Sequence, residues 1–175
     1  MAVPDKPRVL IDANVLFAGS AFPRWPYEVL RHALAGDFRP VLCPLVIEQA
    51  RQHLRKRFPD HLARFEAFLQ KSNHELVPDP TPEQVATNPH LIRDLSDIAV
   101  ALAAIQAGVE YVVSEDKDFT TQDESTAQLR RHLKIMLPGT FLREVMGWSS
   151  EQLEAIRGRK WGDLDANALN QTSDS

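Results

Sequence analysis

Short apolar runs alternate along the chain with longer segments whose apolar residues recur at helical spacing. The first run, Val9-Leu10-Ile11, is rich in β-branched residues and predicts a buried strand from about Arg8 to Asp12. Similar runs predict strands at 40–43, 75–77, 109–114 and 133–137. The clearest helix is predicted from Asp97 to Gly108, with one apolar face made of Ile98, Ala101, Leu102 and Ile105.

Alternating strands and helices are typical of an α/β fold, here with a central parallel sheet of about five strands. Other helices are predicted at 27–35 and after Pro44, Pro59 and Pro138. We expect residues 1–147 to form one domain and residues 148–175 to form a C-terminal helix and a flexible tail. Ser149 and Gln152 have the spacing of a capping box at the start of that helix.

Composition narrows the class of protein. The chain has 175 residues, of which 43% are hydrophobic, and this is enough for a single core. Its formal net charge of −4 excludes a generally basic nucleic-acid binder, so any nucleic-acid site must be a local basic surface. The single cysteine, Cys43, excludes an internal disulfide and a cysteine-based zinc site and suits a reducing cytoplasm. We expect neither a signal peptide nor a membrane span.

Five acidic residues are predicted to lie at one edge of the sheet. In a parallel sheet the carboxyl ends of strands and the first turns of helices share an edge, where open α/β folds bind their ligands. Each acid taken alone has a structural explanation as a helix cap, a turn residue or a solvated side chain. Gathered together, however, they would repel unless a cation neutralised them, and an all-oxygen set favours Mg²⁺ or Mn²⁺. The five are Asp12, Glu48, Asp97, Asp116 and Asp118.

Three segments together carry a resemblance to a known family. They are Arg8-Val-Leu-Ile-Asp-Ala-Asn-Val-Leu-Phe17, Asp97 to Gly108 and Tyr111-Val-Val-Ser-Glu-Asp-Lys-Asp-Phe119, with Glu48 between the first two. In this order they resemble the PIN-domain family, and most closely its VapC-like toxins, over roughly Arg8 to Val145. The resemblance implies a three-layer α/β/α PIN-like fold and a Mg²⁺- or Mn²⁺-dependent endoribonuclease, the toxin of a type II toxin–antitoxin system. It further implies an RNA substrate, a cognate antitoxin protein, a homodimer and a cytoplasmic location.

The same resemblance assigns roles to individual residues. It makes Asp12, Glu48, Asp97 and Asp116 the catalytic acids. Asp12, Asp97, Asp116 and Asp118 are the expected metal ligands, and Asn14 and Ser114 are the expected positioning residues. Hydrolysis would leave a 5′-phosphate and a 3′-hydroxyl. The sequence departs from many relatives at Glu115, where they carry a small residue.

A negative chain needs a local positive surface to hold RNA phosphates. Arg51 and Arg55, in a basic run that ends at Arg57, are the candidate RNA-binding residues, and a second basic run occupies 130–134. Either run could instead be a solvated helix face.

Three other functions are compatible with parts of the sequence. A catalytically silent PIN-like scaffold would be expected to lack some of the acids, and a housekeeping ribonuclease would differ only in its target. A phosphatase with an aspartyl nucleophile at Asp12 would need a second aspartate where Asn14 stands.

Overall fold

A single parallel sheet forms the centre of the fold. The structure, a computed structural model, describes residues 6–89, 95–120 and 127–164. Five strands pair in the order β3-β2-β1-β4-β5, and every pairing is parallel, which confirms the predicted sheet. The strands are β1 Arg8–Ile11, β2 Arg39–Leu42, β3 Glu75–Leu76, β4 Tyr111–Val113 and β5 Lys134–Met136.

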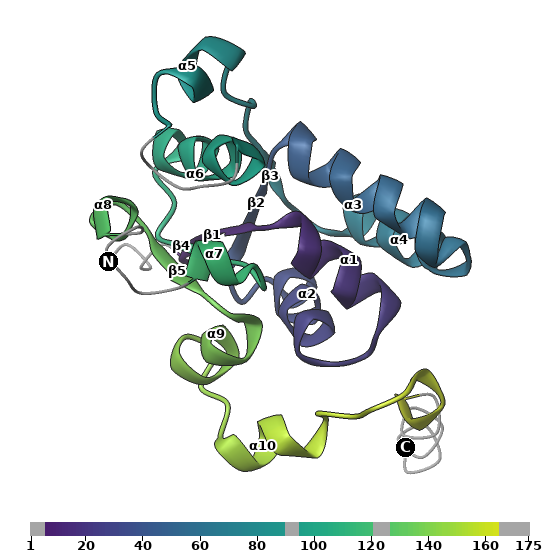
Figure 1. The fold of residues 1–175 in the computed structure, drawn as a ribbon. Helices are drawn as coiled ribbons and strands as arrows, with labels where there is room; N and C mark the ends of the chain where they lie inside the picture. Colours follow the sequence, from purple (N-terminus) through teal and green to yellow (C-terminus); the bar gives the residue numbers. More distant parts are fainter. Residues whose placement is uncertain (1–5, 90–94, 121–126, 165–175) are drawn as a thin grey trace.

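Helices cover both faces of this sheet, and α6 lies across it from α1 and α2 (Figure 1). The three-layer α/β/α architecture is therefore confirmed. In the part of the chain that the structure describes, no helix is long and apolar enough to cross a membrane. The helices are α1 Ala13–Ala21, α2 Trp25–Ala35, α3 Pro44–Arg57, α4 Leu62–Lys71, α5 Pro82–Ala86, α6 Leu95–Ala107, α7 Lys117–Thr120, α8 Ala127–Arg130, α9 Pro138–Glu144 and α10 Ser150–Ala155, with a 3-10 turn, η1, at Pro59–His61.

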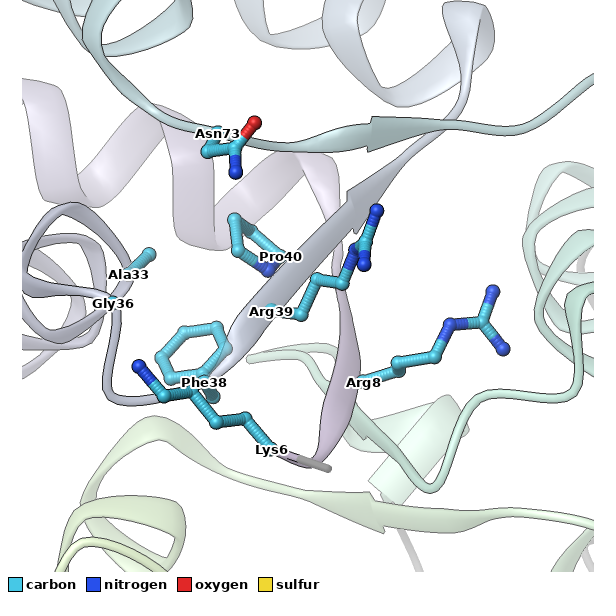
Figure 2. A pocket seen from close by; sticks show the side chains of 8 residues that line it. All are labelled: Lys6, Arg8, Ala33, Gly36, Phe38, Arg39, Pro40 and Asn73. Carbon is cyan, nitrogen blue, oxygen red and sulfur yellow. The ribbon is translucent and has the colours of Figure 1, made fainter. Parts of the chain in front are cut away.

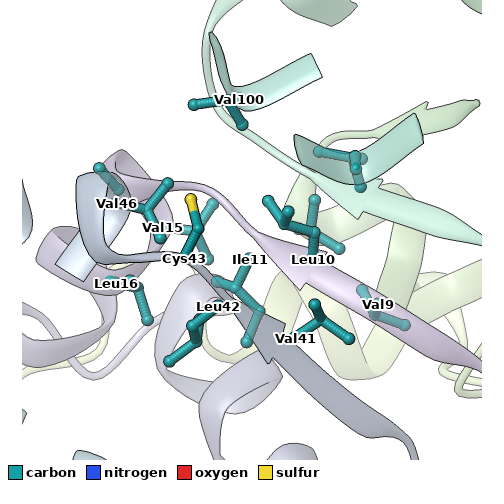
Figure 3. Packing of buried hydrophobic residues seen from close by; sticks show 14 of the residues in the cluster. Val9, Leu10, Ile11, Val15, Leu16, Val41, Leu42, Cys43, Val46 and Val100 are labelled. Atoms are coloured by element: carbon teal, nitrogen blue, oxygen red, sulfur yellow. The ribbon is translucent and has the colours of Figure 1, made fainter. Parts of the chain in front are cut away.

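The core is built around β1. Val9, Leu10 and Ile11 are fully buried, with β2 on one side and β4 on the other. Figure 3 shows these side chains beside Val41 of β2 and Leu16 of α1. A strand buried on both faces reads as a continuous apolar run, which explains why the sequence identified it.

The helix α6 is buried on more sides than the sequence predicted. Ile98 and Ala101 lie in the core as expected, but Val100 and Ala103, off the predicted face, are each only 1% exposed. The short helix α5 packs against α6 and adds to its cover. Gly108, at φ +68°, ends α6 in the left-handed conformation that favours glycine, and strand pairing resumes at Tyr111.

Residues 148–164, which we call the C-terminal segment, pack against the sheet domain. The predicted capping box of α10 is present, because the Ser149 and Gln152 side chains each accept from the other's backbone N–H. The indole N–H of Trp148 donates to His32 at 2.9 Å, and that of Trp25 donates to the Leu153 carbonyl at 2.9 Å. The domain boundary at residue 147 stays a prediction, and most of the predicted tail lies outside the described residues.

A buried ion pair anchors the far end of the C-terminal segment. The Arg159 guanidinium donates to Glu28 Oε1 and to the Pro23 carbonyl, both at 2.7 Å. The Arg159 and Glu28 side chains are only 12% and 7% exposed. Two residues later the Trp161 indole donates to the Ala21 carbonyl at 3.0 Å, so the segment is attached to the junction of α1 and α2.

Candidate active site

Asp12 occupies the point where β1 ends and α1 begins. Its Oδ1 accepts from the Ala13 backbone N–H at 2.7 Å and caps the helix. Its Oδ2 accepts from the Ser114 hydroxyl at 2.7 Å. The residue is 5% exposed, so the predicted capping role is confirmed for a buried carboxyl group, and its chemical role stays a prediction.

The neighbouring strand brings Ser114 and Asp116 to the same place. Ile11 of β1 pairs with Val113 of β4, which sets Ser114 beside Asp12. The buried Ser114 hydroxyl donates to Asp12 and accepts from the Asp116 backbone N–H at 3.1 Å. One serine therefore links Asp12 and Asp116, which we call the acid pair.

Asn14, in the first turn of α1, also connects the ends of β1 and β4. Its Oδ1 accepts from the Glu115 backbone N–H at 3.1 Å. This contact ties the first turn of α1 to the loop that carries Asp116. Asn14 and Ser114, both expected to position the site, thus each bridge the β1 and β4 ends, although Asn14 does so through the backbone of Glu115.

The electrostatics of the acid pair disfavour two negative charges. Burial raises the pKa of the Asp12 carboxyl, the hydrogen bonds from Ser114 and Ala13 partly lower it, and the charge of Asp116 raises it further. A cation at this edge would remove that repulsion. A buried carboxyl group beside a second acid is compatible with binding of a divalent cation.

The other predicted acids are placed less closely. Asp97 is buried, 7% exposed, in the first turn of α6, whose N-terminus faces the carboxyl edge of the sheet. Glu48 is half-exposed and forms an ion pair with Arg51 at 3.1 Å. Asp118 lies in α7, but its side chain is outside the described residues. The roles of these three residues stay predictions.

The donor set fits a small, hard cation. Among residues 6–89, 95–120 and 127–164, no group of three or more His, Cys, Asp or Glu side chains is arranged to hold a metal. Mg²⁺ needs no such cage, because proteins bind it through one or two carboxylates together with water and substrate phosphates. Cys43 does not compete for a metal ion, because burial raises the pKa of its thiol to about 12 and keeps the thiol protonated.

The predicted RNA-binding arginines differ in availability. Arg51 donates to both carboxylate oxygens of Glu66, at 2.6 and 3.2 Å, and also to Glu48. Its guanidinium is thus already neutralised by two acids of the same protein. Arg55 is exposed on α3. The RNA-binding role of both residues stays a prediction.

A basic cavity at the opposite edge of the sheet is unrelated to the acid pair. It has a volume of about 370 Å³ and includes Lys6, Arg8 and Arg39, at the start of β1 and β2 (Figure 2). Arg8 makes a bidentate contact with Glu75 at 2.8 and 3.1 Å, and Arg39 lies 3.7 Å from the same carboxylate. These arginines hold the edge of the sheet together.

The fold of the chain is similar to that of solved structures. One of them is VapBC2 from Rickettsia felis, solved with a DNA fragment from its promoter. It aligns with a TM-score of 0.51 and 14% identity, over 74% of this chain and 98% of the other. Structures of PAE2754 from Pyrobaculum aerophilum and FitAcB from Neisseria gonorrhoeae each give a TM-score of 0.49, at 17% and 15% identity. They cover 71% and 75% of this chain and 94% and 98% of their own chains. No curated protein matches the sequence.

The family match spans the acid pair. The sequence model described as "PIN domain" matches residues 8–118, from the first residue of β1 to the loop and helix that follow β4. This interval is more than half of the chain and contains Asp12, Asn14, Ser114 and Asp116. The chain therefore belongs to the PIN-domain family.

Proposed function

We propose that this protein is a metal-dependent endoribonuclease and the toxin component of a type II toxin–antitoxin system. The observation that carries the proposal is the acid pair, in which Ser114 holds Asp12 and Asp116 together at the carboxyl edge of a PIN-domain sheet. Two carboxylates that repel in a buried site are suited to a divalent cation rather than to covalent catalysis. The structural likeness to VapBC2, at 14% identity, supports the fold on which the proposal rests.

In this proposal Asp12, Asp97 and Asp116 hold Mg²⁺ or Mn²⁺, and Glu48 and Asp118 complete the site. The bound ion would activate water and neutralise charge on the phosphodiester in the transition state. Ser114 orients both members of the acid pair, while Asn14 fixes the loop that carries Asp116. Hydrolysis breaks the bond between phosphorus and the 3′ oxygen, leaving a 5′-phosphate and a 3′-hydroxyl.

The proposal includes partners. A cognate antitoxin would inhibit the nuclease, and two copies of the chain would form a homodimer. These two partners rest on the VapC-like resemblance of the sequence. Because the substrate would be cellular RNA, the expected compartment is the cytoplasm.

The direct test is cleavage of a panel of labelled RNAs. We expect cutting with Mg²⁺ or Mn²⁺, no cutting with EDTA, and none with Asp116→Asn in either metal. Cutting that persists in EDTA would contradict the metal, and cutting by Asp116→Asn would contradict the site. Metal binding at the acid pair with no cutting of any RNA would instead favour a silent scaffold.

Removing the Ser114 hydroxyl should weaken the site without unfolding it. Ser114→Ala takes away the hydrogen bond that stabilises the ionised Asp12 and the contact that fixes Asp116. Partners of this kind are typically worth about 10- to 100-fold in metal affinity or activity, and we expect a loss of that size. Steady-state cleavage over a Mg²⁺ titration measures it.

The matched control is Ser20→Ala. Ser20 is also buried, but its hydroxyl donates to the Leu16 carbonyl within α1. Its loss should leave the Mg²⁺ dependence unchanged. Equal cleavage curves for Ser114→Ala and the unchanged protein would show that Ser114 has no positioning role.

A further inference from the structure

A cavity of about 500 Å³ adjoins the acid pair. Asn14 and Glu115, which meet through the 3.1 Å hydrogen bond described above, form the side of the cavity nearest to the acids. Three aromatic side chains, Phe17, Phe22 and Trp25, line its other walls. Each is only partly buried and packs on the edge of the core. The cavity therefore offers apolar ring surfaces and is also lined by Asn14 and Glu115, the sequence neighbours of the acid pair.

Three arginines, Arg24, Arg57 and Arg157, line the same cavity. In the described parts of the chain, neither Arg24 nor Arg57 forms an ion pair with a carboxylate, and Arg157 pairs with the exposed Glu154. The guanidinium groups lie over aromatic rings, with Arg24 5.2 Å from the Phe22 centroid, Arg57 5.5 Å from Phe17 and Arg157 5.7 Å from Trp25. Positive charge is thus fixed beside rings, next to a negative catalytic edge.

A second cavity continues from the first. It has a volume of about 540 Å³ and shares Trp25, Glu115 and Arg157 with its neighbour. Arg143 of α9 and Leu153 of α10 also line it. We call the two cavities together the Trp25 groove. The C-terminal segment builds one wall of this groove, because Leu153 and Arg157 both belong to it.

We propose that the Trp25 groove binds single-stranded RNA beside the acid pair, with phosphates on Arg24, Arg57 and Arg157 and bases on the aromatic rings. The proposal rests on the nuclease function and names the surface that holds its substrate. Proteins that bind single strands combine a basic track with aromatic platforms, and only unpaired bases expose the faces that such platforms need. A chain of net charge −4 requires such a local track.

Two other described basic surfaces suit RNA less well. Arg51 is held by Glu66 and Glu48, and Arg8 is held by Glu75. The Arg8 cavity also lies at the amino edge of β1, opposite the acid pair. Of the basic run at the end of α3, Arg57 lines the groove, whereas Arg55 does not.

The test measures binding separately from cleavage. A fluorescent single-stranded RNA about 12 nucleotides long is titrated with the full chain in EDTA, by anisotropy, at several salt concentrations. We expect Arg24→Gln and Arg57→Gln each to weaken binding by about 3- to 10-fold and to reduce the salt slope by about 0.7. Phe22→Leu should weaken binding about fivefold or more with an unchanged slope. Lys56→Gln, which removes the neighbouring charge on α3, should have no effect.

Each outcome separates the groove from the nuclease. Losses in the three groove variants but not in Lys56→Gln support the proposal. Unchanged affinity in Arg24→Gln and Arg57→Gln overturns it, and the nuclease proposal stands if Mg²⁺-dependent cleavage persists. If the groove variants keep their RNA affinity but lose binding to an antitoxin protein, the RNA proposal is also overturned, and the groove is instead a binding site for a protein. If the protein without substitutions neither binds nor cleaves RNA, both proposals are overturned.

Discussion

Asp12→Asn is expected to lower RNA cleavage by roughly 10³-fold or more, about 4 kcal/mol in the barrier, while making the metal-free fold more stable. The loss follows because asparagine lacks the charge that would hold the cation. The gain follows because burial and Asp116 disfavour the ionised Asp12 carboxyl. Asparagine can still accept from the Ala13 N–H and cap α1, so the fold should be kept.

The size of the stability change depends on pH. The pKa of Asp12 is raised in the folded state, so the carboxylate costs nothing below its unfolded-state pKa and costs progressively more as pH rises through the folded-state pKa. The melting temperature of Asp12→Asn in EDTA should therefore exceed that of the unchanged protein by a margin that grows as pH rises above the unfolded-state pKa of Asp12 and becomes constant above its folded-state pKa. Each 1 kcal/mol in the free energy of unfolding would shift the melting temperature by about 2–4 °C.

Two controls make this result specific. Asp60→Asn removes a carboxylate that is exposed in η1, and it should leave the melting temperature unchanged. Mg²⁺ should raise the melting temperature of the unchanged protein, by preferential binding to the folded state, and should fail to do so for Asp12→Asn. A margin that shrinks with rising pH would contradict the proposed electrostatics even if cleavage were lost.

Arg159→Met is expected to lower the free energy of unfolding by about 3 kcal/mol, which corresponds to roughly 6–12 °C in melting temperature. Among the residues that the structure describes, the variant leaves the buried Glu28 carboxylate with the half-exposed Arg31 as its one cationic partner, at 3.2 Å. It also removes the donor to the Pro23 carbonyl. Chemical denaturation of the full chain measures the loss.

The comparison variants separate a buried charge from a surface one. Arg157→Met breaks the Arg157–Glu154 pair, in which both side chains are 66% exposed, and should cost less than about 1 kcal/mol. Adding Glu28→Gln to Arg159→Met should recover part of the loss, because the uncompensated charge is then gone. Equal losses in Arg157→Met and Arg159→Met would show that burial of the ion pair has no special weight.

The central elements were predictable because their signals are local. The apolar run of β1, the glycine that ends α6 and the capping box of α10 each lie within a few neighbouring residues. The topology then follows from alternating strands and helices, and it brings Asp12 near Asp116.

Side-chain partners at long range were not predictable. Nothing local shows that Arg51 is held by Glu66 on α4 rather than left available for RNA. Arg157 reaches the cavity beside Asn14 only because the C-terminal segment folds back over Trp25. Phe22 and Arg24 are two positions apart in sequence, but only the packing of α1 against α3 shows that they line one cavity with Arg57.

The order of synthesis also bears on this site. Asp12 and Ser114 are 102 residues apart, on strands that pair only when β4 is present. A growing chain on the ribosome that has made β1, α1, β2 and α3 therefore lacks half of the acid pair, and contacts so distant in sequence form slowly. A site built in this way is incomplete until most of the protein has been translated.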